Sequence, residues 1–196
     1  MVKLNLVSTP TATDLISVST AKNFLRITHS GDDTLIGNLI LAAIEVAQNY
    51  TNSRFLVYEY KMVMNNWDDV LLQNDLPNIV LPYPPLKEIS HVKYYDTDNA
   101  LQTWSSSNYW AGTFKNQAGF LAINTGVNTP TLYDREDAIE IQFKCGYGTS
   151  GSDVPEAIKI ATLLILGKMY EVREDSVSKL PKASEYILDP YRFKTY

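Results

Sequence analysis

Apolar residues recur at helical spacing in two parts of the chain. Between Asp32 and Asn52 they follow one another three or four positions apart, which predicts an amphipathic helix capped by an aspartate. The same spacing predicts a shorter helix over 17–27 and a third over 155–172, where Pro155 suits the first turn. This third helix is apolar on nearly every side. We therefore expect part of its surface to face other helices and part to face another subunit.

The spacing changes to that of strands between residues 54 and 146. The segment 55–65 is rich in aromatic and β-branched residues with partial alternation, as in a half-buried strand. Short apolar runs separated by turn residues predict further strands. These are 78–81, 89–95, 101–104, 109–114, 120–123 and 138–144. Strands of this length and spacing predict an antiparallel sheet or a small barrel.

Together these patterns predict an α+β fold, in which a small helical bundle is built from both chain ends and carries an inserted antiparallel β domain. The bundle is expected to comprise residues 1–53 and 147–196, and the β domain residues 54–146. Because the helical spacing stops and resumes at these boundaries, we expect the helix of 32–52 to pack on the helix of 155–172.

Composition and charge narrow the classes of function. The chain has 196 residues, 45% of them hydrophobic, which suffices for the core of one ordinary domain or of a small domain with an insertion. With 17 Lys+Arg against 22 Asp+Glu, the net charge of −5 gives no overall basic field, so specific DNA binding is disfavoured. No apolar run approaches the roughly 20 residues that span a bilayer, and we expect no membrane partner and no signal peptide.

Few residues could carry chemistry. Cys145 is the single cysteine, and with only His29 and His91 beside it no four-ligand zinc cluster is expected. A nucleophilic Cys145 activated by a histidine is a weak alternative to a packing role. Acidic residues cluster without the spacing of a calcium loop, so caps, turns and solvated helix ends explain them better. The clusters are Asp32–Asp33, Asp68–Asp69, Asp134 with Glu136–Asp137, and Glu171 with Glu174–Asp175. We predict no catalytic residue, metal or cofactor.

An ordered set of short motifs carries more information than any of these residues. The set comprises Ala21–Ile27, Asp32–Ile36, Tyr50–Arg54, Leu81–Leu86, Phe143–Gly148, Val154–Lys159, Tyr170–Glu174 and Leu188–Arg192. Over residues 13–193 it resembles the head-tail connector proteins, also called adaptor or head-completion proteins, of long-tailed phages and prophages. The resemblance implies a helical bundle with an inserted β domain and a structural role that is not enzymatic.

The resemblance also implies partners and a location. Such proteins form a ring beneath the twelvefold portal, join the DNA-filled capsid to the tail and extend the DNA channel. Expected partners are therefore the portal protein, a tail-proximal connector or tail-completion protein, further copies of the chain, and passing DNA without sequence-specific binding. The expected location is the virion, after assembly in the cytoplasm of the bacterial host.

Two groups of candidate interface residues follow. In related connectors the C-terminal segment docks on or into the portal, and aromatic side chains with an arginine are typical binding anchors. The candidate portal-binding residues are Tyr186, Leu188, Tyr191, Arg192, Phe193 and Tyr196. The alternative is that this segment packs only on its own bundle. Candidate bundle or subunit contacts on the third helix are Ile160, Leu163, Leu166 and Tyr170.

Two other classes of function stay open. One is a small hydrolase that uses a carboxylate cluster, which requires a second polar group beside a carboxylate in a cleft. The other is a carbohydrate- or protein-binding β module, in which Trp104 and Trp110 stack on the ligand. That module requires both tryptophans on the solvent face of the sheet.

Overall fold

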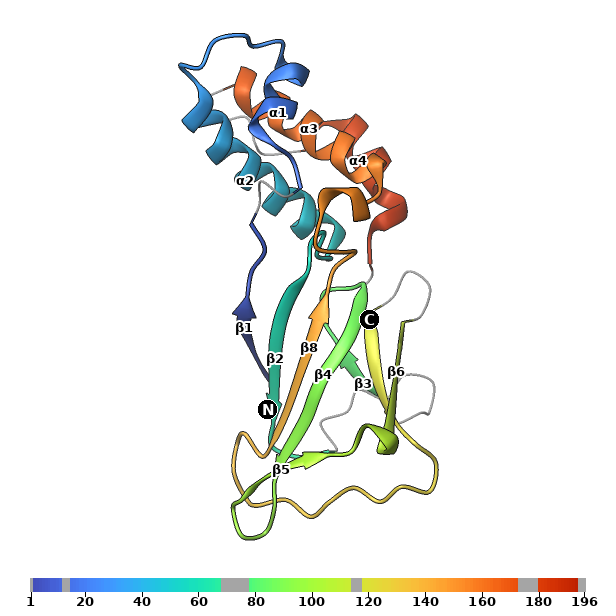
Figure 1. Cartoon of the computed structure of the whole chain (residues 1–196). Coiled ribbons are helices and arrows are strands. Elements are labelled where there is room, and N and C mark those ends of the chain that lie inside the picture. The colour runs from blue at the N-terminus through green and yellow to red at the C-terminus, as the bar shows by residue number, and fades with distance from the viewer. Residues whose placement is uncertain (1, 12–14, 68–77, 114–117, 173–179, 194–196) are drawn as a thin grey trace. The chain divides into compact units, whose positions relative to one another are not determined.

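The computed structural model describes residues 2–11, 15–67, 78–113, 118–172 and 180–193 (Figure 1). In this part of the chain it contains helices and two antiparallel sheets, which confirms the predicted α+β class. The chain divides into two compact units. The helical unit comprises Pro10–Leu56 and Tyr147–Lys194, and the β unit comprises Met1–Thr9 and Val57–Gly146.

Four α-helices form the helical unit in the described residues. They are α1 (Val18–Leu25), α2 (Asp33–Thr51), α3 (Glu156–Glu171) and α4 (Lys182–Leu188), the last followed by a 3-10 turn over Asp189–Tyr191. The Ser17 hydroxyl caps α1 by accepting the Thr20 N–H at 3.1 Å. Both α1 and α2 end at a residue with left-handed backbone, Arg26 and Asn52, whose N–H groups bond the last turn. The short helix α4 was not predicted.

The packing of α2 on α3 is as predicted and makes the core of the helical unit. Ala43 and Ala47 on α2 and Ala161 on α3 are fully buried. Such small side chains let two helix backbones approach closely, and larger residues pack around them. These are Ile36, Ile40 and Ile44 from α2 with Ile158, Ile165 and Leu166 from α3. Both α1 and α4 also contact α3.

Buried polar side chains organise the end of α2. The Gln48 Oε1 atom accepts the backbone N–H of Phe55 at 3.0 Å, and Phe55 itself is fully buried. The Thr51 hydroxyl donates to the Ala47 carbonyl at 2.9 Å and lies 2.8 Å from the Ser53 hydroxyl. These bonds satisfy polar groups that the chain buries as it leaves the helix.

Two antiparallel sheets form the β unit. The larger has the order β1-β2-β8-β4-β5 and the smaller the order β3-β7-β6. The strands of the larger are β1 (Lys3–Ser8), β2 (Tyr58–Met64), β8 (Ile139–Cys145), β4 (Leu86–Tyr95) and β5 (Leu101–Trp104). Those of the smaller are β3 (Asn78–Leu81), β7 (Gly119–Ile123) and β6 (Tyr109–Thr113). The predicted strands therefore exist, with ends that shift by a few residues.

The first residues of the chain depart from the prediction. We expected residues 1–53 to belong to the bundle, but β1 pairs with β2, with Leu4 opposite Met62. Residues up to Thr9 therefore belong to the β unit. The alternation of Leu4 and Leu6 with polar neighbours is a short strand signal, but it does not reveal the partner, because β2 lies more than fifty residues away.

Alternate residues of the larger sheet point into the core of the β unit. On β8 the side chains of Ile139, Ile141, Phe143 and Cys145 are fully buried, and the residues between them are half-buried. Trp67 packs beside Trp104, with 4.7 Å between their rings, in the same core. Within the described residues, no helix has the length and apolar character needed to cross a membrane.

Two buried serines in the helical unit make a matched test of polar burial. Both Ser184 and Ser53 are fully buried. The Ser53 hydroxyl has a hydrogen-bond partner, whereas the Ser184 hydroxyl has none among the described residues. We predict that Ser184→Ala raises the free energy of unfolding by about 1 kcal/mol, because it removes a buried hydroxyl without a partner. Ser53→Ala should lower it by about 1 kcal/mol. Urea unfolding of both variants measures the difference, and a destabilised Ser184→Ala protein would contradict the prediction.

Candidate interaction surfaces

The C-terminal segment divides into exposed and buried residues. Tyr186 on α4 is 83% exposed, the most exposed of the large hydrophobic side chains described. Leu188, two residues later, is 0% exposed and belongs to the core of the helical unit. Tyr191 is half-buried against that core, and Arg192 is exposed. Tyr196 lies outside the described residues.

Three contacts hold the end of this segment on its own bundle. The Tyr50 hydroxyl donates to the Asp189 carboxylate at 2.6 Å, and this bond, helped by burial, raises the pKa of Tyr50. The Arg192 guanidinium lies 5.2 Å from the centre of the Tyr50 ring, within cation–π range. The Phe193 N–H donates to the Thr51 carbonyl at 2.9 Å. This last bond satisfies one of the free carbonyls at the end of α2.

These contacts correct one of the predicted portal-binding residues. Leu188 is not available on the surface, because its side chain fills the core of the bundle. The alternative interpretation, in which the segment packs on its own bundle, therefore holds for Leu188 and in part for Tyr191. Tyr147 also faces this region, where burial, with a further contribution from Tyr191, raises its pKa to about 12. Tyr186 and Arg192 remain exposed.

The candidate contacts on α3 divide in the same way. Leu166 lies in the core, and the Tyr170 hydroxyl donates to the Asp32 carboxylate, so both act within the bundle. Ile160 is 44% exposed and Leu163 half-buried, which leaves an apolar strip on the outside of the helix. The exposed ring of Phe24 lies close to Gly167, further along α3.

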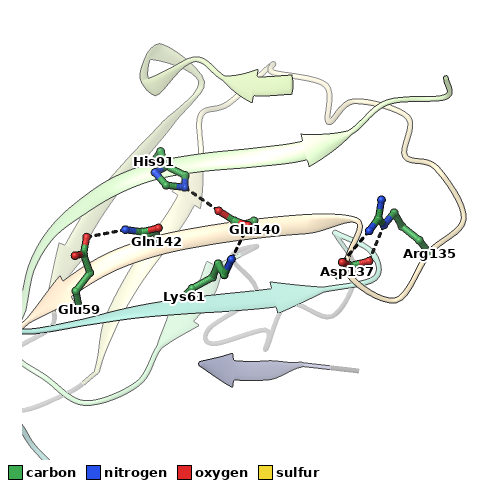
Figure 2. Close-up of polar contacts among 7 residues, drawn as sticks. All are labelled: Glu59, Lys61, His91, Arg135, Asp137, Glu140 and Gln142. Carbon is green, nitrogen blue, oxygen red and sulfur yellow. Dashed lines mark hydrogen bonds and ion pairs between the residues drawn. The ribbon is translucent and has the colours of Figure 1, made fainter. Parts of the chain in front are cut away.

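The outward face of the larger sheet carries a set of paired charges that the sequence analysis missed (Figure 2). On it, the Glu140 carboxylate contacts His91 Nε2 at 3.0 Å and Lys61 Nζ at 3.2 Å. Burial raises the pKa of Glu140, but these two partners outweigh burial and leave the pKa below its usual value. The Glu59 carboxylate accepts the Gln142 amide at 2.8 Å, which lowers the pKa of Glu59. We call this set, Glu59, Lys61, His91, Glu140 and Gln142, the polar ladder.

The alternation of charged residues along β2 and β8 was the signal for the polar ladder. Glu59 and Lys61 flank a buried tyrosine, and Glu140 and Gln142 flank a buried isoleucine. A period of two places such residues on one face of a sheet. The pairing between the strands, with Lys61 opposite Gln142, could not be read from the sequence.

Several residues of the acidic clusters form ordinary ion pairs. Asp33 pairs with Lys22 and Glu136 with Lys3, each at 2.7 Å. Asp137 forms a bidentate ion pair with Arg135, as Figure 2 shows. Asp68–Asp69 and Glu174–Asp175 lie outside the described residues. Within the described part, no group of three or more His, Cys, Asp and Glu side chains is placed to hold a metal ion.

The structure contradicts two remaining alternatives. Cys145 points into the core, whereas His91 contacts Glu140 on the outward face, so the sheet separates the two and they form no catalytic pair. The binding module with two stacking tryptophans is also wrong. Trp110 is 52% exposed, but Trp104 is 5% exposed and packs in the core.

Comparison with known proteins defines the class. A family model described as head completion protein matches residues 14–180. The chain therefore belongs to the head completion protein family, which confirms the resemblance drawn from the sequence and supports a structural role as a head-tail connector. A comparison with curated proteins gave no match.

Solved structures share the fold over nearly the whole chain. A chain from the neck of an empty gene transfer agent particle, computed with C6 symmetry, has 16% identity and a TM-score of 0.79, with 99% of this chain and 97% of that chain covered. A chain from the virion of the native particle has 18% identity and a TM-score of 0.79, covering 98% and 96%. A chain from the native neck, computed with C12 symmetry, has 19% identity and a TM-score of 0.76, covering 99% and 97%.

Leu188 and Tyr186 make a matched pair on one helix. We predict that Leu188→Ala lowers the free energy of unfolding by about 3 kcal/mol, because it leaves a cavity in the core. Tyr186→Ala should change it by less than about 0.5 kcal/mol, since the side chain is exposed. Chemical denaturation followed by circular dichroism measures both. Equal losses from the two substitutions would show that Tyr186 also stabilises the fold.

The lowered pKa of Glu140 predicts a pH dependence of stability. A carboxyl whose folded pKa is depressed stabilises the fold above its unfolded pKa, and this stabilisation is lost as pH falls through the folded value. At pH 7, Glu140→Gln should therefore lower the unfolding free energy by about 1 kcal/mol. The difference from the natural protein should shrink as pH falls from 5 to 3, where the natural carboxyl also becomes neutral.

Thermal melts of both proteins from pH 7 to pH 3 measure this convergence. Glu136→Gln is the control, because Glu136 pairs with Lys3 on the exposed surface and such pairs contribute little. A difference that stays constant over this pH range would show that Glu140 acts through packing rather than through its charge.

Proposed function

We propose that this chain forms a ring in the neck of a tailed-phage particle, beneath the portal, where it joins the DNA-filled head to the tail and extends the DNA channel. The family match over residues 14–180 carries the proposal. The shared fold with chains from particle necks of C6 and C12 symmetry supports a ring. Such a protein acts by its surfaces and not by catalysis, and it needs no cofactor.

The portal is bound by the exposed part of the C-terminal segment. Tyr186 presents a large aromatic side chain that makes no contribution to its own core, and Arg192 supplies a guanidinium beside the Tyr50 ring. Tyrosine and arginine are enriched among residues that dominate binding energy. The buried Leu188 and the Phe193 backbone hold these two residues in a fixed position on the bundle. A binding site held in place in this way loses less conformational entropy on association.

Contacts between copies involve the apolar strip on α3. Ile160 and Leu163 leave apolar surface uncovered on the helical unit, and Phe24 adds an exposed ring near Gly167. Apolar surface of this kind gains free energy when a neighbouring copy covers it. A tail-proximal connector or tail-completion protein binds the other end of the ring.

DNA passes through the ring without specific binding. The net charge of −5 gives no field that attracts phosphate. On the polar ladder, Lys61 is already paired with Glu140, and the neighbouring Lys144 is paired with Glu88 at 2.7 Å. Lysines held by carboxylates gain less from phosphate, because they must give up a partner. The protein is assembled in the host cytoplasm and then remains in the virion.

Binding to the portal tests the proposal. Purified chain is mixed with portal rings from the same phage or prophage, and binding is measured by sedimentation and electron microscopy. We predict that the double substitution Tyr186→Ala with Arg192→Ala weakens binding at least about tenfold, since anchors of this type contribute about 2 kcal/mol each. Tyr133→Ala removes an exposed tyrosine of the β unit and should leave binding within about twofold.

The outcomes separate the parts of the proposal. Thermal melts show whether each variant is folded. If the double variant binds portal rings normally, the docking surface lies elsewhere on the chain. If the natural chain neither binds portal rings nor forms a ring upon them, the proposed function is wrong.

A further inference from the structure

We infer that neighbouring subunits of the ring are joined by strand addition, in which β1 of one copy pairs with β6 of the next. The inference rests on the proposed ring and specifies how its subunits interlock. It depends on two open strand edges in the β unit.

The first open edge belongs to β1. Among the described strands, β1 pairs only with β2, so one side of its backbone faces outward. Leu6 is 52% exposed, and Val2 and Val7 are exposed to a similar degree. Natural proteins usually protect such an edge with charges, prolines or bulges, because an open apolar edge attracts another strand.

Protection of the β1 edge is incomplete. Its single charged residue, Lys3, is paired with Glu136, which holds the ammonium group at 2.7 Å. A bulge lies between Leu6 and Ser8 and interrupts only the end of the strand. Residues Lys3 to Leu6 therefore keep a regular edge that can accept a partner.

The second open edge belongs to β6, which pairs only with β7 in the described part of the chain. Its residues Trp110, Ala111 and Thr113 are exposed, and the Trp110 ring packs edge-on against Phe120 at 4.9 Å. That contact fixes the ring while leaving about half of it uncovered. An exposed and fixed tryptophan is a typical anchor at an interface.

The other two edge strands are less suited to this role. In β3, Ile79 and Leu81 are buried. The strand β5 has four residues, whereas β1 and β6 have six and five. The most exposed edges of comparable length are therefore β1 and β6.

The places of these strands fit a cyclic ring. A ring of identical subunits requires two different surfaces that face opposite ways, since each copy contacts one neighbour with each. Within the β unit, β1 forms one edge of the larger sheet, whereas β6 contacts β4 towards the other edge (Figure 1). Strand addition between them would bury Leu6 beside Trp110 of the neighbour and pair backbone groups of both edges.

Chemical crosslinking tests this contact in the assembled ring. A variant with Asn5→Cys in β1 and Ala111→Cys in β6 is assembled on portal rings and treated with a short reagent that links two thiols. The natural Cys145 is fully buried and should not react. Strand addition predicts a ladder of linked subunits from the double variant. The two single variants should give no ladder, because each copy then carries one reactive thiol.

A matched control asks whether another edge is used. The pair Asn5→Cys with Thr103→Cys places the second thiol on the exposed β5 edge instead. A ladder from this pair and none from the first would overturn β6 as the partner. Rings that form on the portal but give no ladder with the first pair would overturn the inference and leave the proposed function standing. Failure of the natural chain to form rings would instead count against the proposed function.

A second experiment uses charge at the same edge. Leu6→Glu places a carboxylate where apolar contact is expected and should weaken ring formation about tenfold. Leu101→Glu changes a similarly exposed leucine on β5 and should have an effect within about twofold. Both positions are exposed, so thermal melts should show folded subunits. Equal effects of the two substitutions would contradict strand addition at β1.

Discussion

The pairing of β2 with β8 is the constraint on which the rest of the fold depends. After β1 and the first two helices, the chain returns to the β unit through β2 and leaves it through β8, and the two strands pair from Tyr58 opposite Cys145 to Met64 opposite Ile139. This pairing closes a long loop and so carries an entropic cost that the ladder and the core must offset. It also returns the chain to the helical unit, where the Tyr147 N–H donates to the Phe55 carbonyl at 3.1 Å. The bond therefore joins the segments that connect β2 to α2 and β8 to α3, two helices that pack on each other.

The same two strands separate the apolar face of the larger sheet from its polar face. Their inward side chains are apolar and fully or largely buried, and their outward side chains form the polar ladder. Each charge of the polar ladder has a partner from a neighbouring strand, as with Glu140 between Lys61 and His91. The pairs therefore favour the observed register, because a slip by one residue would turn charged groups into the core.

The sequence was informative where a repeating pattern was long and local. The helices α2 and α3 were predictable because their apolar spacing extends over several turns, and β3 and β5 were predicted with the observed bounds. The strand β1 was missed, because its partner β2 is distant in the sequence. The helix α4 was missed because it has seven residues, fewer than a periodic signal requires.

The candidate surfaces were only partly predictable for a related reason. Composition identified the C-terminal segment, but it could not distinguish Tyr186, which is exposed, from Leu188, which is buried two residues later. That difference depends on which side of α4 meets the bundle. Trp104 and Trp110 differ in the same way, because the exposure of each depends on which face of its strand meets the core.

The hydrogen bond from Phe193 to the end of α2 links the terminal segment to the longest helix of the bundle. A ligand that binds only the folded arrangement stabilises it by mass action, and the gain grows with the logarithm of ligand concentration. A partner that binds the terminal segment in this arrangement would therefore also stabilise the end of α2 against fraying. Docking and rigidity are thermodynamically coupled in such an arrangement, so a subunit becomes harder to unfold once it has taken its place in a particle.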